Sequence, residues 1–70
     1  MKVYTFEKGK KIFEFYNIRR AFEKALEIAK ETNEQIFITA MHKPSYKQDW
    51  YTVHPDGQIV TDLKNYKADN

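Results

Sequence analysis

One strongly amphipathic segment stands in a chain that otherwise has the pattern of β-strands. Over residues 18–29 the apolar positions recur at the i, i+3, i+4, i+7 spacing of one buried helix face. These positions are Ile18, Ala21, Phe22, Ala25, Leu26 and Ala29. Asn17 precedes the segment as a favoured N-cap residue, and Asn33, which tolerates left-handed backbone, marks its end. One helix covers only one face of a sheet, so the pattern predicts a second, uncovered face.

The first two predicted strands, 3–8 and 11–16, form a hairpin. A two-residue loop that begins at Gly9 has glycine where the turn needs a positive φ. The resulting pairs are Phe6 with Phe13 and Tyr4 with Phe15. The alternative loop begins one residue earlier and pairs Phe6 with Lys11. Because a one-residue slip turns every side chain to the other face, we favour the register that gathers the four aromatic residues on one face.

Three more strands are expected after the helix, at 35–42, 50–54 and 58–62. Pro44 ends the first of them, and a polar loop over 43–48 follows. The turn at 55–57 then joins the last two strands. The pairs expected there are Val53 with Ile59 and Tyr51 with Thr61.

The chain is therefore predicted to be a single small α+β domain over 1–63, with a polar C-terminal tail over 64–70. Its element order is β-β-α-β-β-β, an antiparallel sheet with one amphipathic helix packed on one face. The pattern leaves the order of the strands in the sheet open. No residue motif is specific enough to name a family.

Composition narrows the classes of function. There is no cysteine, so disulfides and thiolate metal sites are excluded. The 12 Lys+Arg and 10 Asp+Glu residues leave a formal charge of +2, which is too weak to indicate nucleic-acid binding by itself. No apolar run approaches the ~20 residues of a membrane span, so we expect a cytoplasmic protein without a membrane partner. The richness in Lys, Glu, Asn, Ile, Tyr and Phe is typical of AT-rich genomes and suggests a phage or mobile-element source.

The sequence offers little for catalysis. Ser45 is the only serine and lies in the polar loop, without the flanking pattern of a nucleophile elbow. His42 and His54 are expected to lie roughly 13 Å apart on paired strands, too far to share one metal ion. Gly9 and Gly57 are the only glycines, so there is no phosphate-binding loop. We predict no catalytic residues, no metal, no cofactor and no small-molecule substrate, and hence no enzyme.

The uncovered sheet face is the first candidate binding site. The residues assigned to it are Phe37, Met41, Trp50 and Val60, with Val3 and Ile12 as further members. Apolar patches larger than a few hundred Å² on a small soluble domain usually mark interaction sites, and Trp and Met are enriched in interfaces. The pattern predicts a protein partner or a homodimer, and a phage-type inhibitor or modulator of a host protein. The alternative is that the 43–48 loop and Tyr66 cover this face.

A second candidate site would bind nucleic acid. Lysines and aromatic residues alternate along the 43–51 segment, and such a mixture can hold phosphates while it stacks bases. The residues assigned to it are Lys43, Tyr46, Lys47 and Trp50, extended by the hairpin lysines Lys8, Lys10 and Lys11. The alternative is an ordinary solvated loop.

Overall fold

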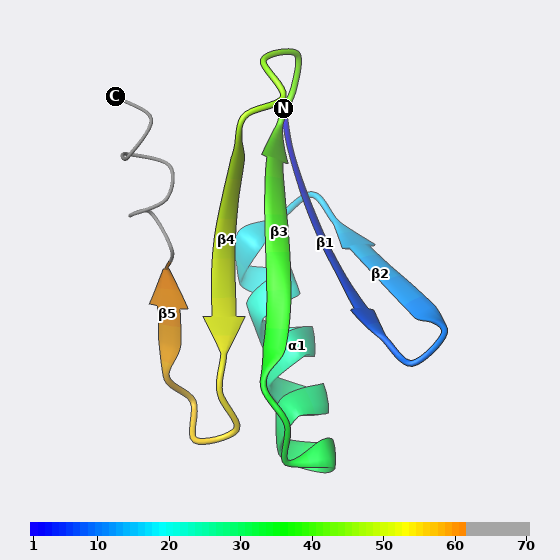
Figure 1. Cartoon of the computed structure of the whole chain (residues 1–70), viewed down its shortest axis with the longest axis vertical. Coiled ribbons are helices and arrows are strands. Elements are labelled where there is room, and N and C mark those ends of the chain that lie inside the picture. Colours follow the sequence, from blue (N-terminus) through cyan, green and yellow to red (C-terminus); the bar gives the residue numbers. More distant parts are fainter. Residues whose placement is uncertain (62–70) are drawn as a thin grey trace.

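The computed structural model describes residues 1–61 and arranges them as an antiparallel sheet with one helix across one face (Figure 1). The elements are β1 (Lys2–Lys8), β2 (Lys11–Phe15), α1 (Ile18–Thr32), β3 (Ile36–His42), β4 (Gln48–Val53) and β5 (Ile59–Thr61). The predicted α+β class and element order are confirmed. The end of the last predicted strand at residue 62, the domain boundary at 63 and the 64–70 tail lie outside the described residues.

The first hairpin has the predicted register. Gly9 adopts a φ of 64°, and the pairs include Phe6 with Phe13 and Tyr4 with Phe15. The rings of Phe6 and Phe13 stack with their centroids 4.9 Å apart. The aromatic residues of this hairpin therefore face α1, and they form one wall of the core.

Both predicted helix caps are present. The side-chain oxygen of Asn17 accepts hydrogen bonds from the backbone N–H groups of Arg19 at 2.9 Å and Arg20 at 3.2 Å. Asn33 ends the helix with a φ of 56°. All six predicted apolar residues of the helix pack on the core, although Ile18, Phe22 and Leu26 are only partly buried, and the buried stripe has one member that was not predicted, Ile28. The residues of this stripe are Ala21, Ala25, Ile28 and Ala29.

The strands of the second hairpin pair as predicted, but they begin and end at other residues than predicted. Val53 lies opposite Ile59 and Tyr51 opposite Thr61. β4 begins at Gln48 rather than at residue 50, because pairing with β3 continues up to Met41. Within the described residues β5 is limited to Ile59–Thr61.

The sheet order is β2-β1-β3-β4-β5, so the N-terminal strand lies inside the sheet, between β2 and β3. The β1–β3 pairs run from Lys2 with His42 to Thr5 with Thr39 and stop there. Beyond Thr5 the β1–β2 hairpin diverges from β3 (Figure 1), and we call the resulting gap the split. α1 packs against β1, β2, β3 and β4, so it holds both branches of the sheet together on one side.

The helix-side core is almost entirely apolar. Its fully buried members include Ile38, Ala40 and Val53, and Asp49 is the one polar residue buried in the described part of the chain. None of the described helices is both long enough and apolar enough to span a bilayer.

Candidate functional site

The side of the sheet turned away from α1, here called the open face, carries large exposed apolar side chains. Phe37, Thr52 and Val60 lie opposite one another in one cross-strand row, and Trp50 lies opposite Thr39 in the next row. The exposed fractions are 64% for Phe37, 37% for Trp50 and 43% for Val60. With the 43–47 loop in place these residues remain accessible to solvent. Tyr66, the other residue expected to cover this face, lies outside the described residues.

The other residues assigned to this face from the sequence differ in their exposure to solvent. Met41 is only partly exposed, and it lies two rows from Phe37, roughly 13 Å along β3 at ~3.3 Å per residue. Ile12 is 67% exposed, near the β1–β2 turn. Val3 is different: it pairs with Met41, yet it is only 8% exposed. The expectation that Val3 adds accessible surface to this face is therefore wrong, because its side chain is buried.

The charges on the open face all have one sign. The alternation of side chains along the five described strands places two charged residues on this face, Glu7 opposite Ile12 and Glu14 opposite Thr5. Lys8 and Lys11, which pair with each other, project to the helix side. The centre of the open face therefore carries only uncharged side chains, both apolar and polar, and its β1–β2 branch carries the acidic ones.

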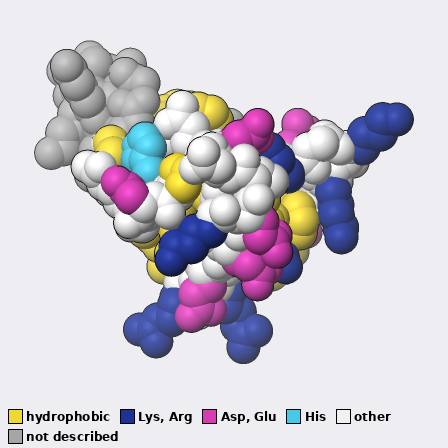
Figure 2. All heavy atoms as spheres, turned by 90° about the horizontal axis from the view of Figure 1, so that it is seen from below, with side chains coloured by type: hydrophobic (Ala, Val, Ile, Leu, Met, Phe, Trp, Pro, Cys, Tyr) yellow, Lys and Arg dark blue, Asp and Glu magenta, His cyan; other side chains and the backbone are white. Residues whose placement is uncertain are grey.

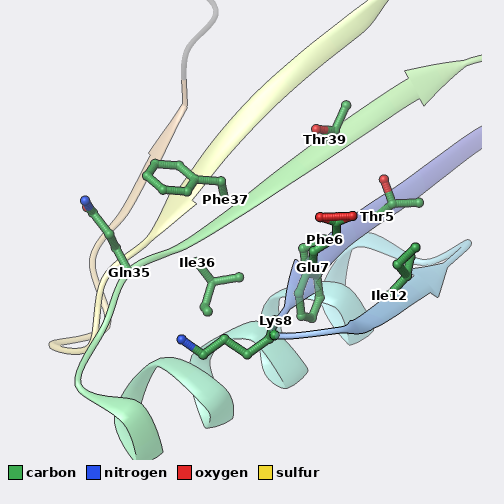
Figure 3. A pocket seen from close by; sticks show the side chains of 10 residues that line it. Thr5, Phe6, Glu7, Lys8, Ile12, Gln35, Ile36, Phe37 and Thr39 are labelled. Atoms are coloured by element: carbon green, nitrogen blue, oxygen red, sulfur yellow. The ribbon is translucent and has the colours of Figure 1, made fainter.

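A groove opens on this face where β1 leaves β3. Its volume is about 710 Å³. Its floor is formed by Phe6 and Ile36, which belong to the buried core. Phe37, Thr39 and Thr5 stand on the open-face side, as Figure 3 shows. The other residues that line it are Glu7, Lys8, Gly9, Ile12 and Gln35. Sequence patterns missed this groove, because it depends on where β1–β3 pairing stops.

The residues of the alternative nucleic-acid site are not brought together. Lys43, Tyr46 and Lys47 belong to the loop after β3, beside the first residues of β1. Lys8, Lys10 and Lys11 lie at the other end of β1, roughly 20 Å away at ~3.3 Å per residue. Trp50 lies on the open face near the loop.

Basic side chains also fail to form a single patch on the surface drawn in Figure 2, where lysines and arginines alternate with acidic side chains. Several of them already have partners. Lys8 forms an ion pair with Glu34, and the Nζ atom of Lys24 lies 2.7 Å from Oε1 of Glu27. The Glu27 hydrogen bond and charge raise the pKa of Lys24 above its ordinary value.

The loop after β3 has a defined backbone conformation. The backbone N–H of His42 donates to the carbonyl oxygen of Lys47 at 2.8 Å, and that of Tyr46 donates to the carbonyl oxygen of His42 at 2.6 Å. Tyr46 has a φ of 62° and projects into solvent. The Lys43-Pro44 peptide bond is cis. The loop therefore presents an isolated aromatic ring rather than a stack of them.

One polar contact was not anticipated from the sequence. His42 Nε2 lies 3.2 Å from Asp49 Oδ2, across the strand ends that flank the loop. His54 follows β4 at its far end, so the two histidines are well separated. In residues 1–61 no group of three or more His, Asp or Glu side chains is placed to hold a metal ion.

The Tyr51 phenol, two residues along β4 from Asp49, has a perturbed pKa. Burial raises the pKa of the Tyr51 hydroxyl, and the nearby Asp49 carboxylate and Tyr4 raise it further. The Tyr51 ring packs edge-on against Phe22 with a centroid distance of 5.3 Å. This environment favours a neutral tyrosine that stabilises the core.

Comparisons with family models, curated proteins and solved structures gave no match.

Proposed function

We propose that the chain is a non-enzymatic binding protein that recognises another protein through the open face. The observation that carries this proposal is the exposed apolar row at Phe37 and Val60 with Trp50 beside it. Exposed apolar surface is costly in water, and contiguous patches on small domains usually mark interaction sites. Trp and other aromatic residues also provide much of the binding energy in known interfaces.

The charge distribution supports a protein partner over a nucleic acid at this face. Glu7 and Glu14 would repel a phosphate backbone laid across the sheet. The same two carboxylates would attract lysine or arginine side chains at the rim of a protein interface. A phage-type inhibitor or modulator of a host protein is a role of this kind, and that assignment stays a prediction from composition.

The test compares two exposed aromatic residues in different places. Phe37 on the open face and Tyr46 on the loop are 64% and 66% exposed. The immobilised chain would capture partners from a lysate of the cells that encode it, and the captured protein would then be purified and titrated. We expect Phe37→Ser and Trp50→Ser to weaken binding at least tenfold, as for interface hot spots, and Tyr46→Ser to leave it unchanged.

Two outcomes would contradict the proposal. Normal binding by the Phe37→Ser and Trp50→Ser variants would exclude the open face as the contact surface. Light scattering that shows a stable dimer, dissociated by Phe37→Ser, would mean that a second copy covers this face instead of another protein.

The nucleic-acid alternative rests on the exposed Tyr46 ring between Lys43 and Lys47. It predicts binding of labelled single strands that weakens steeply with salt and is lost in Tyr46→Ser. The protein-binding proposal predicts the reverse ranking of the Tyr46 and Phe37 variants. One set of variants therefore separates the two functions.

A further inference from the structure

The split leaves backbone edges inside the sheet. β1 pairs with β2 as far as Lys8, and β3 pairs with β4 from Ile36 onward. Between β1 and β3, however, the pairs end at Thr5 with Thr39. In the described part of the chain, residues 6–8 and 36–38 therefore have no cross-strand partner on the sides that face each other. Such edges are templates for pairing with another strand.

The split has an apolar base. Phe6 and Ile36 form its floor, and the exposed side chains of Ile12 and Phe37 stand on either side of it (Figure 3). Its volume of about 710 Å³ lies within the roughly 300–1,000 Å³ range of ligand pockets. A bound segment would therefore find both backbone partners and apolar contact at the same place.

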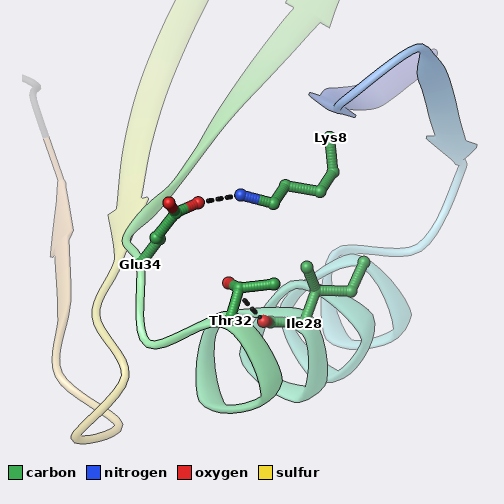
Figure 4. Close-up of polar contacts among 4 residues, drawn as sticks. All are labelled: Lys8, Ile28, Thr32 and Glu34. Atoms are coloured by element: carbon green, nitrogen blue, oxygen red, sulfur yellow. Dashed lines mark hydrogen bonds and ion pairs between the residues drawn. The ribbon is translucent and has the colours of Figure 1, made fainter.

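Charge limits what kind of segment fits. Lys8, which lines the groove, reaches across the split and forms an ion pair with Glu34, which precedes β3 (Figure 4). Glu7 lines the groove on the open-face side, and it forms no ion pair with any residue among 1–61. The one charge that the groove leaves uncompensated is therefore negative.

We propose that the split binds an extended segment of a partner protein that alternates apolar and basic residues. The segment pairs with the free edge of β3 at residues 36–38, directs an apolar side chain toward Phe6 and Ile36, and places a basic side chain beside Glu7. This inference rests on the proposed function, because it assigns the partner's local structure and charge at the same face.

The experiment uses the full chain labelled with ¹⁵N and a panel of short synthetic peptides. The peptides alternate lysine with valine, isoleucine, leucine or phenylalanine, and a matched panel carries glutamate in place of lysine. We expect the basic panel to shift the amide signals of residues 6–8 and 36–38 saturably, and the acidic panel to bind at least tenfold more weakly. N-methylation of alternate peptide bonds should abolish binding, because it removes the N–H donors that pair with β3.

Matched variants test the charge. Glu7→Gln should weaken binding of the basic peptides about two- to fivefold, as for an exposed ion pair. Glu31→Gln makes the same change on the exposed helix surface and should have no effect. Equal loss in both variants would mean that only net charge matters, and it would overturn the assignment of Glu7.

Other outcomes overturn the proposal in distinguishable ways. Equal binding of acidic peptides, or shifts confined to other residues, would exclude a basic segment in the split. Shifts of the same amides on concentrating the protein alone would show that a second copy fills it. If no peptide binds while Phe37→Ser still abolishes capture of the partner, the proposed function stands and strand pairing in the split does not.

Discussion

The imidazole of His42 and the carboxylate of Asp49 meet at 3.2 Å where β3 and β4 enter the loop that joins them. The two side chains differ in their access to water, with exposed fractions of 33% for His42 and 12% for Asp49. Since a buried carboxylate without a partner is costly, the contact offsets the burial of Asp49.

This difference predicts an asymmetry between two substitutions. His42→Ala should lower the free energy of unfolding by about 1–3 kcal/mol, because it removes the partner of a buried carboxylate. Asp49→Ala should cost less, because the remaining imidazole can still bind water. Urea denaturation of both variants and of the double variant measures the effect. Equal costs, or a larger cost for Asp49→Ala, would mean that the contact does not offset burial.

Truncation of two adjacent residues on β3 should lower stability by very different amounts. Ile38 is fully buried against the helix, and Phe37 projects from the open face. Ile38→Ala should cost about 2–5 kcal/mol through lost burial and a cavity. Phe37→Ala should change stability by less than about 1 kcal/mol, since its ring is accessible in the native state. Thermal and urea unfolding measure the cost of each substitution. A large cost at Phe37 would show that something covers the open face.

The N-cap of α1 provides a third test. Asn17→Ala removes the acceptor for the backbone N–H groups of Arg19 and Arg20, and it should cost about 1 kcal/mol. Asn33→Gly is the control at the other end, where glycine readily adopts the observed φ of 56° and stability should be nearly unchanged. An Asn17→Ala variant as stable as the wild-type chain would show that water replaces the cap without cost.

Local patterns predicted most of the secondary structure, because they act over a few residues. The register of the first hairpin follows from Gly9 and from the aromatic residues around it, and both asparagine caps follow from side-chain chemistry. Ile28 was missed although its spacing from Ala25 and Ala21 fits the buried stripe. That omission was avoidable from the sequence.

Features that depend on distant pairing were not predictable in the same way. β1 lies beside β3, and the residues they pair are far apart in the chain, so no local pattern specifies where the pairing stops. The groove between them and its lining by Glu7 follow from that endpoint. The contact between His42 and Asp49 likewise requires the exact start of β4. Alternation did place Phe37, Trp50 and Val60 on one face, because strand periodicity is local.

A last prediction concerns alkaline pH. Burial raises the pKa of Tyr51, and the charge of Asp49 adds to the effect, so the folded protein keeps this proton to a higher pH than the unfolded chain does. The unfolded tyrosine ionises near pH ~10. Tyr51 therefore contributes stability that is complete below this pH and is lost as the pH rises toward the raised pKa of the folded state.

Tyr51→Phe removes the phenol and retains the ring that packs against Phe22. Compared with this variant, the wild-type protein should lose more of its free energy of unfolding as the pH rises above ~10, because its unfolded state releases a proton that the folded state retains. Urea denaturation across this pH range measures the difference, and Tyr46→Phe controls for the loss of an exposed phenol. A wild-type protein that instead gained stability over Tyr51→Phe in this range would mean that the fold favours the phenolate, contrary to its burial beside Asp49.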